Sequence, residues 1–517
     1  MPLRGVPTTM SYHKDLPQFP ESYWTASQHE KGKFPKLESD EAADVVVVGG
    51  GISGITTAYL LSQEGLRVVL LEAGEILNGT TAHTTAKITA QHDLIFDELI
   101  RTEGKEKASL YYGAAKDAMD FIRGTIGKHE IDCGYTEQDA YVYTHHADYV
   151  VKVENEAKAY QELGIPGAYL DKIPLNLPLF GAVRMDAQAQ FHPLNYLLKL
   201  VREFLKAGGK IYEQTTAVDV EHVDTPKVMT SDGHRVGCKY VVSCTHFPFY
   251  DGQGFYFARM HADRSYVLGL QVEDEYPGGM YLSAEDPKRS VRYAPLEDGN
   301  KLIILGGQSH KTGQGICTIN HYDELRKFAE NQFKIKEISY RWSAQDLVTG
   351  DKIPFIGRIT ASHPDVFVAT GFRKWGMTNG TAAALIIRDL IMEKDNPYAK
   401  LFTPSRSLSW KTVGKLISDN ADVAKHLISG KLEYVKKRPE QLEKDEGSVV
   451  QIQGRRAGGY RDKDGQLFLV DTTCTHMGCE VEWNNGERTW DCPCHGSRFS
   501  ITGEVVEGPA EKPLVRL

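Results

Sequence analysis

The clearest pattern of apolar and polar positions lies between residues 44 and 72. Four consecutive valines, Val45–Val48, precede a glycine-rich turn, a mostly apolar segment and a second apolar run, Val68–Leu71. Short continuous apolar runs bounded by glycine are typical of buried parallel strands. This stretch therefore predicts a strand, a tight turn, a helix and a second strand.

The remaining pattern divides the chain into parts of different character. Residues 100–130 and 150–165 have a helical pattern, and residues 210–360 carry many short β-like runs. Asp365–Ala369 predicts another buried strand, Gly380–Met392 the helix after it, and residues 446–517 a set of strands separated by glycine turns. We therefore predict an α/β protein, with a Rossmann-like domain, an inserted mixed β-sheet domain and a small all-β domain at the end.

Composition and charge exclude some classes of function. The chain has 517 residues, 41% of them hydrophobic and 25% charged, with a net charge of −9. Such a balance does not suggest a nucleic-acid partner. We find neither a signal peptide nor an apolar run long enough to span a membrane, so we expect a cytoplasmic protein without a membrane span.

The glycine-rich turn carries the first chemistry. Gly49, Gly51 and Gly54 form a GxGxxG pattern between strand and helix, and Glu72 ends the next strand. These glycines allow a tight turn, close approach of a pyrophosphate and close helix packing, and the acid is placed to accept ribose hydroxyls. The segment predicts a dinucleotide site, although the pattern alone does not choose FAD over NAD.

Cysteine and histidine residues cluster near the C-terminus in CTHMGC (Cys474–Cys479) and CPCHGS (Cys492–Ser497). Each segment supplies one cysteine and one histidine: Cys474 with His476, and Cys492 with His495. Two thiolates on one iron and two imidazoles on the other are the ligand set of a Rieske 2Fe–2S centre. A zinc site is the alternative, but it would need neither the extra cysteines nor the CPCHGS sequence.

Two further segments resemble the D-amino-acid oxidase/glycine oxidase superfamily. They are GTTAHTTAKIT (Gly79–Thr89), which follows the acidic strand, and VATGFRKWGMTNGTAAA (Val368–Ala384). The resemblance implies FAD, held between these two loops and the glycine-rich turn. The FAD-binding positions so implied are Gly49, Gly51, Ile52, Ser53, Gly54, Glu72, Ala73, Thr80, Thr81, His83, Thr84, Val218, Gly371, Gly376, Met377 and Thr378.

Two histidines occur in segments expected near the flavin. His83 matches a GTT-x-H pattern that carries covalently bound flavin in dimethylglycine and sarcosine dehydrogenases, so a covalent bond and an ordinary loop histidine both stay open. His246 stands in VVSCTHFPF, where many flavoproteins have the glycine of an ATG strand end, which puts flavin contact there in doubt.

The C-terminal segments resemble Rieske domains, and the resemblance extends to Cys479 and Cys494, which match the disulfide that bridges the two ligand loops in cytochrome bc complexes. Free thiols are the alternative. Together the resemblances give the domains: an N-terminal extension on the surface, 1–40; an FAD-dependent oxidoreductase, 41–395; a linker, 396–435; and a Rieske domain, 436–517. Within the second, we expect FAD binding at 41–95, 195–250 and 340–395 and a substrate domain at about 251–340.

The two cofactors together imply a redox enzyme. The resemblance implies oxidation of an amine or amino acid, with hydride passing to FAD N5 and the imine product being hydrolysed. Electrons would then pass singly to the cluster and on to an unknown acceptor. Three alternatives are an NAD(P)H-driven reductase, which needs a second dinucleotide fold, a Rieske oxygenase, which needs a further mononuclear iron site, and a redox sensor without turnover.

Candidate substrate residues are less clearly marked. Arg373, Lys374 and Trp375 lie inside the late loop, where a cation would stabilise reduced anionic flavin. A carboxylate clamp could also form on the β-like runs of the middle domain, from Arg264, Tyr266, Arg292, Tyr293 and His310.

The redox potential of the cluster can be predicted in direction. Imidazole ligands give Rieske centres roughly −150 to +300 mV. Ser497 matches a serine that donates to a bridging sulfur, but Phe499 stands where bc-type proteins have a tyrosine donor. Losing one hydrogen bond to sulfur favours the oxidised cluster, so a redox titration should give a potential below that of bc-type proteins. An equal or higher value would refute this expectation.

Overall fold

The fold is described from a computed structural model, which covers residues 16–17, 19–28, 31–222, 224–314, 318–407, 414, 416, 420, 423, 435 and 437–517. Most of the predicted linker 396–435 and the first part of the predicted N-terminal extension lie outside these residues. Within the described helices, none is both long and apolar enough to cross a membrane.

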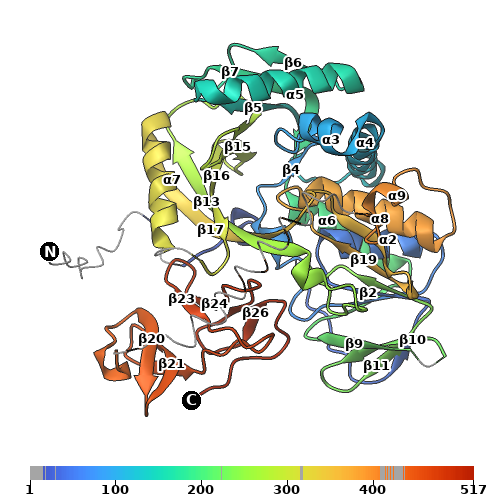
Figure 1. Ribbon diagram of the computed structural model, residues 1–517, viewed down its shortest axis with the longest axis vertical. Helices are drawn as coiled ribbons and strands as arrows, with labels where there is room; N and C mark the ends of the chain where they lie inside the picture. Colours follow the sequence, from blue (N-terminus) through green and yellow to red (C-terminus); the bar gives the residue numbers. More distant parts are fainter. Residues whose placement is uncertain are drawn as a thin grey trace.

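A mainly parallel sheet forms the first layer (Figure 1). Its order is β18 (Phe355–Thr360), β19 (His363–Thr370), β12 (Tyr240–Ser243), β2 (Val45–Val48), β3 (Val68–Leu71) and β8 (Lys210–Tyr212). Only β18 is antiparallel to its neighbour. Every residue of β2 and β3 is buried, as continuous apolar runs in a parallel sheet require.

Helices pack against this sheet and against one another. They are α2 (Ile52–Gln63), α4 (Lys105–His129), α6 (Pro193–Lys206) and α8 (Gly376–Ile391). A small sheet lies beside it, in the order β1 (Glu41–Ala42), β11 (Arg235–Gly237), β10 (Pro226–Thr230) and β9 (Ala217–His222). The first strand, helix and strand and the late strand and helix thus form as their patterns predict.

A larger, mixed sheet stands next to the parallel one. Its order is β17 (Ile335–Thr349), β13 (Met260–Val272), β16 (Lys301–Lys311), β15 (Arg289–Pro295), β14 (Met280–Ser283), β5 (Thr136–Thr144), β7 (Gly181–Gln190) and β4 (Lys87–Ile88), with β6 (Gly167–Leu170) paired to β7. It therefore takes strands from two stretches of chain, and β4–β7 precede the region 251–340 in which we expected the inserted domain.

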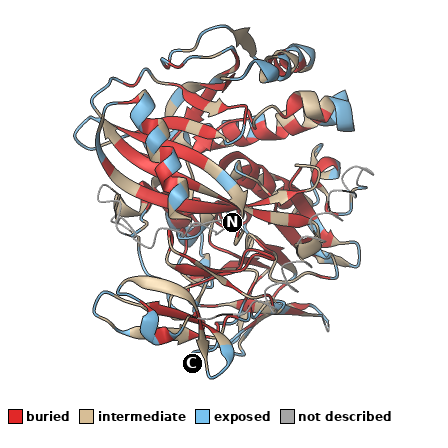
Figure 2. Ribbon diagram, turned by 60° about the vertical axis from the view of Figure 1, so that its left-hand side comes forward, coloured by how far each residue is buried: buried red, intermediate tan, exposed pale blue. Residues whose placement is uncertain are grey.

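The two faces of this sheet have different neighbours. One face, which we call the loop face, contacts the segment 79–89: Trp342 Nε1 donates to His83 O at 2.9 Å. The other, the α7 face, is covered by α7 (Ile319–Gln332), with Tyr266 and Tyr322 ring centroids 5.0 Å apart. Strand residues alternate between these faces, so each side chain's face follows from its register. Figure 2 shows that both sheets are largely buried.

The remaining helices surround these layers: α3 (Phe96–Glu103) and α5 (Val150–Leu163) lie near α4 and β5–β7, and α9 (Ala399–Phe402) contacts β18. The helix α1 (Tyr23–Ala26) corrects one expectation. Tyr23 and Trp24 are buried, and Trp24 Nε1 donates to Thr84 O at 2.7 Å. This part of the N-terminal segment is therefore packed into the core and does not lie on the surface.

The C-terminal β domain comprises residues 437–517. One sheet has the order β20 (Glu446–Ile452), β21 (Arg455–Arg461) and β22 (Leu467–Val470), and the other the order β23 (Glu482–Asn484), β24 (Thr489–Asp491), β25 (Arg498–Phe499) and β26 (Val505–Glu507). The domain lies below β17 and α7 in Figure 1, against the large sheet.

Candidate active site and metal centre

The GxGxxG turn is packed so closely that only glycine fits. Gly49 has φ +104°, and a Cβ there would lie 2.5 Å from Cys244 O. A Cβ on Gly54 would lie 1.9 Å from Gly49 O, which seats the first turn of α2 directly on the loop. The N-terminus of α2 is therefore held directly at the turn, the position at which a pyrophosphate would meet it.

Glu72 closes the other side of this turn. Its carboxylate accepts hydrogen bonds from Gly50 N and Gly74 N, both at 2.8 Å. Burial raises the pKa of Glu72, and the two N–H donors act against that rise. Ala73 is exposed beside it, and Val218 lies half-buried on β9. The acid is held at the end of β3, where it could take hydroxyl groups of a dinucleotide.

The segment 79–89 lies across the start of α2. Thr80–His83 form a 3-10 turn, and Thr81 Oγ1 accepts from Ile52 N at 3.0 Å. His83 Nδ1 lies 2.9 Å from Gly79 O. This contact leaves both readings of His83, covalent attachment or a loop histidine, as predictions.

The late loop, residues 371–380, meets the same place. Thr378 Oγ1 donates to Thr89 O at 2.9 Å and accepts from Thr89 N at 3.1 Å. A Cβ on Gly380 would lie 3.1 Å from Ile52 Cγ2. Gly371 has φ +76°, Gly376 begins α8, and Met377 is buried. Three segments far apart in sequence therefore converge where we expected FAD.

The predicted catalytic residues of this loop point in different directions. Arg373 Nη2 lies 3.4 Å from His92 O, Trp375 stacks on His92 with centroids 4.9 Å apart, and Lys374 Nζ contacts Ser265 and Ser309. Burial raises the pKa of Asp346, on the adjoining strand, to about 7, although Lys374 acts against the rise. Lys374 is the one that lies on the loop face of the large sheet.

Strand register places the five candidate residues for a carboxylate clamp on different faces of the large sheet. Arg264, Tyr266 and His310 lie on the α7 face, where Tyr266 OH is 2.9 Å from His310 Nε2, and so cannot join a clamp on the loop face. Tyr293 is on the α7 face as well, with Gln138 Nε2 at 3.4 Å from its hydroxyl. Arg292 alone of the five faces the other way.

Arg292 is a buried cation with unused donors. It is 1% exposed, its guanidinium lies 5.1 Å above the Trp24 ring, and Nε and Nη2 have no hydrogen-bond partner among the described residues. Burial lowers its pKa to about 9. Lys87 lies near it, donating to Tyr281 O at 3.0 Å, and burial lowers its pKa to about 7. Lys87 belongs to the segment 79–89, and Arg292 lies close to it.

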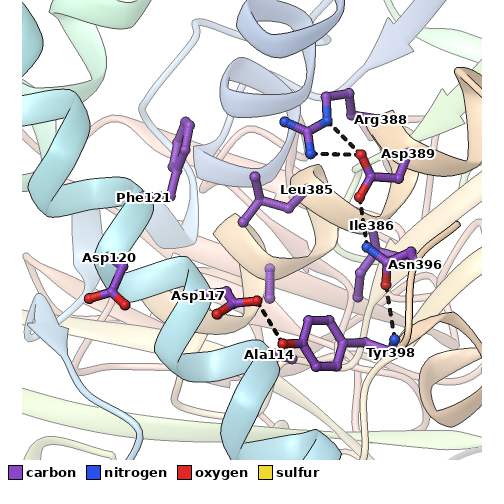
Figure 3. Close-up of a pocket in the computed structure, with 11 residues that line it drawn as sticks. Ala114, Asp117, Asp120, Phe121, Leu385, Ile386, Arg388, Asp389, Asn396 and Tyr398 are labelled. Atoms are coloured by element: carbon purple, nitrogen blue, oxygen red, sulfur yellow. Dashed lines mark hydrogen bonds and ion pairs between the residues drawn. The ribbon is translucent and has the colours of Figure 1, made fainter. Parts of the chain in front are cut away.

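In the described residues, neither the two other glycine pairs nor the pocket between α4 and α8 forms a second dinucleotide site. Gly278 and Gly279 precede β14, and Gly306 and Gly307 lie inside β16, so neither pair opens a helix. A pocket of about 340 Å³ lies between α4 and α8 (Figure 3). Its polar groups are paired internally, as in Tyr398 OH to Asp117 Oδ2 at 2.6 Å.

The cysteine and histidine residues of the C-terminal β domain come together as a ligand set. Cys474 and Cys492 are buried and free, and the His476 and His495 rings are 5.0 Å apart and perpendicular. The Nδ1 atoms of both histidines are buried without a hydrogen-bond partner in the described structure. Two thiols and two unpaired imidazole nitrogens are the donors a Rieske cluster requires, so the residues fit that group.

Neighbouring side chains enclose this centre. Cys479 and Cys494 form a disulfide that joins the two ligand loops. Ser497 Oγ accepts from Ala510 N at 3.0 Å, and Phe499 is fully buried. Phe257, from the larger domain, lies edge-on to both histidines, at 5.7 Å from His495 and 6.4 Å from His476.

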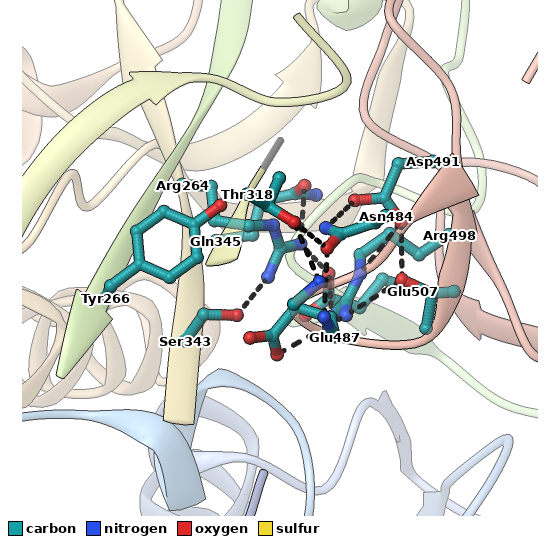
Figure 4. A network of polar contacts seen from close by, with 12 residues as sticks. Arg264, Tyr266, Thr318, Ser343, Gln345, Asn484, Glu487, Asp491, Arg498 and Glu507 are labelled. Carbon is teal, nitrogen blue, oxygen red and sulfur yellow. Dashed lines mark hydrogen bonds and ion pairs between the residues drawn. The ribbon is translucent and has the colours of Figure 1, made fainter. Parts of the chain in front are cut away.

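Charged side chains join the two domains (Figure 4). Arg264 is fully buried and donates to Ser343 Oγ at 2.9 Å, to Gln345 Oε1 at 3.2 Å and to Glu507 Oε2 at 2.6 Å. Arg498 also reaches Glu507, at 3.2 Å. Burial would raise the pKa of Glu507, but these two arginines hold it down to about 2. The two arginines therefore favour the ionised form of Glu507.

Gln345 connects the two sites. Its carbonyl oxygen lies 3.4 Å from Thr80 Oγ1 of the segment 79–89, while its side-chain amide is 2.9–3.1 Å from the position a Cβ would take on Gly496, next to His495. Sequence reasoning missed Gln345 and Glu507 and gave Arg264 another role. The contacts of Gln345 with Thr80 and Gly496, and of Arg264 with Glu507, join residues more than 150 positions apart, and no local pattern marks them.

Comparisons with known proteins find one family match for the larger domain and another for the C-terminal β domain. The family model "FAD dependent oxidoreductase" matches residues 44–390, and "Rieske [2Fe-2S] domain" matches residues 433–517. The Rieske 2Fe-2S iron-sulfur protein YhfW of Bacillus subtilis (strain 168) is 52% identical over 498 residues, which cover 96% of this chain and 97% of that protein.

More distant relatives cover the larger domain. Gamma-glutamylputrescine oxidoreductase of Escherichia coli (strain K12) is 23% identical, over 72% of this chain and 88% of its own. The glycine oxidase structure from Geobacillus kaustophilus superposes with a TM-score of 0.59 at 18% identity, covering 71% of this chain and all of that one. That likeness shows the fold.

The close packing of the GxGxxG turn predicts the effect of a substitution at Gly54. Gly54→Ala should give protein that purifies without flavin, because the new Cβ would overlap Gly49 O and push α2 off the turn. Flavin absorbance per protein would measure the loss. Gly124→Ala is the matched control, since a Cβ there meets nothing within 4 Å on helix α4, and should keep full flavin content. Normal flavin content in Gly54→Ala would contradict the assignment.

Proposed function

Because the chain belongs to the FAD dependent oxidoreductase family and carries a Rieske [2Fe-2S] domain, we propose that it oxidises an amine or amino acid and passes the electrons singly from the FAD site to the cluster. The observation that carries this proposal is the contact of Gln345 with both Thr80 and the His495–Gly496 loop. A chain that only combined two independent cofactors would have no reason to bring these loops to one residue.

When bound, FAD accepts a hydride from carbon, and a 2Fe–2S cluster carries one electron at a time. Loss of this hydride from carbon and of a proton from nitrogen to solvent would convert the substrate's C–N bond into an imine, which water hydrolyses to a carbonyl compound and an amine or ammonia. The two electrons would then leave the cluster one at a time for an unknown acceptor. FAD would be held by Gly49, Gly51 and Gly54, Glu72 and the loops 79–89 and 371–380, and the cluster by Cys474, His476, Cys492 and His495.

A substrate that carries a carboxylate is supported by Arg292. A buried guanidinium with unused donors is costly unless an anion pairs with it. Arg292 lies on the loop face, beside the segment 79–89, with Lys87 as a second buried cation. Lys374 and Ser265, on the same face, would help to orient the substrate. Amino acids, including N-alkylated ones, are therefore the substrate class we favour.

Anaerobic mixing with a panel of amino acids, N-methylated amino acids and diamines tests this proposal through bleaching of the flavin absorbance. For a substrate with a carboxylate, Arg292→Met should lower kcat/KM by about 10- to 100-fold, since a charge-assisted hydrogen bond contributes about 1.5–3 kcal/mol. Arg289→Met, on the opposite face of β15, is the control and should leave kcat/KM near the wild-type value. If no compound bleaches the flavin but NADH does, the reductase alternative holds; if nothing does, a sensor is favoured.

Removing the cluster should separate the two halves of the reaction. Cys474→Ser should lack the 2Fe–2S cluster yet keep FAD and its anaerobic reduction by substrate, because the two sites have separate ligands. Electron paramagnetic resonance of the reduced protein would check the cluster, and reduction of cytochrome c or ferricyanide would check electron export. Cys133→Ser, a buried cysteine far from the cluster loops in sequence, is the control. Unchanged export in Cys474→Ser would contradict the proposal.

A further inference from the structure

The contact between the two domains is built for one fixed position. Arg264 has lost all contact with solvent, and its carboxylate partner, Glu507, belongs to the other domain. Separating the domains would leave Arg264 without this partner, and removing one partner of a buried ion pair is strongly destabilising. The pair is therefore a strong constraint on domain position.

Backbone approaches at the same contact leave no room for adjustment. Gly313, just after β16, faces the ligand loop, and a Cβ there would lie 2.6 Å from both Cα and N of Pro493. A Cβ on Gly496 would lie 2.8 Å from Ala262 Cβ. Gly486 N donates to Thr318 Oγ1 at 2.9 Å. Because Gly313 faces backbone atoms, no side-chain rotation could relieve a larger residue at that position.

More hydrogen bonds extend the contact along α7 and β17. Tyr322 OH donates to Glu487 Oε1 at 2.7 Å, and Arg341 Nη1 donates to Gly486 O at 2.7 Å. Gln314 Nε2 lies 3.4 Å from Pro493 O. Contacts of this kind, buried and directional, favour a single arrangement over sliding.

We propose that the C-terminal β domain is permanently seated on the large sheet, with Arg264 as the positioning residue, so that the cluster loop stays against Gln345 throughout the reaction and the domain does not move to exchange electrons. This inference rests on the proposed function for its meaning, but the seating itself is a property of the polypeptide. It assigns Arg264, Gln345, Glu507 and Gly313 a shared task in holding the two redox sites together.

Gly313→Ala tests the seating and has a matched control at the other end of β16. Gly313 and Gly299 flank β16 with φ of +71° and +83°, but a Cβ on Gly299 meets nothing within 4 Å. Both variants carry the same left-handed strain, so only Gly313→Ala should separate the domains. We expect faster hydrogen exchange in segments 260–266 and 484–498 of Gly313→Ala alone, in protein with or without cofactors. Equal exchange in the wild type and both variants would overturn the proposal.

Electron transfer gives a second readout. After photochemical reduction of the flavin, the rate of cluster reduction should fall markedly in Gly313→Ala, because electron transfer slows steeply as the two cofactors move apart. The rate should be unchanged in Gly299→Ala. No transfer in the wild type would refute the proposed function, whereas equal transfer in all three proteins would refute the seating alone.

A covalent staple tests whether movement is needed. Thr318 Oγ1 and Asn485 Oδ1 are 3.1 Å apart across the contact, so we choose Thr318→Cys with Asn485→Cys as the staple and verify the bond by thiol titration. The stapled protein should reduce the cluster and export electrons as fast as the Thr318→Cys single variant, which cannot form the bond. Slower electron transfer in the stapled protein alone would show that the domain must move, and would overturn the inference.

Discussion

The burial of one guanidinium group, that of Arg264, governs how the two redox domains fit together. A charge removed from water must be paired and hydrogen-bonded, or folding becomes unfavourable. Arg264 meets this requirement with Ser343 and Gln345 from its own domain and Glu507 from the other. The larger domain would expose an incompletely paired site without its C-terminal partner, so the two domains behave as parts of one folding unit at this contact.

Close packing also determines the structure of the dinucleotide turn. Gly49 and Gly54 approach neighbouring backbone so closely that α2 starts almost on top of the loop. The loops 79–89 and 371–380 then complete the site through Thr81 and Thr378. Each of these contacts uses a hydroxyl or an N–H near the end of an element, so the proposed flavin site would lie where these elements begin or end.

Local patterns were sufficient for some of this architecture. The buried runs at β2 and β3, the GxGxxG turn and the late strand and helix are short-range signals, and they formed as predicted. The proposed cluster ligands, Cys474, His476, Cys492 and His495, could be chosen from the sequence because they lie in two short motifs. Their convergence depends on loops that a disulfide joins, and the pairing was implied by resemblance alone.

Contacts between residues far apart in the chain could not be predicted from the sequence. The membership of β4–β7 in the large sheet could not be foreseen, since pairing between distant strands leaves no local trace. Which face an arginine occupies depends on register, and register places Arg264 and Arg292 on opposite faces of the large sheet: Arg264 pairs with Glu507, and Arg292 lies on the face of the segment 79–89. Trp24 was similarly misjudged, because a polar segment rich in proline gave no sign that its aromatic residues are buried.

The strand β17 has a consequence for how this chain can change over time. Trp342 reaches the segment 79–89 from one face, and Ser343 and Gln345 hold Arg264 on the other. A deletion of a single codon within the strand would exchange the two faces, spoiling flavin packing and domain attachment at one stroke. Descendants of this gene can therefore accept replacements along the strand more readily than any change in its length.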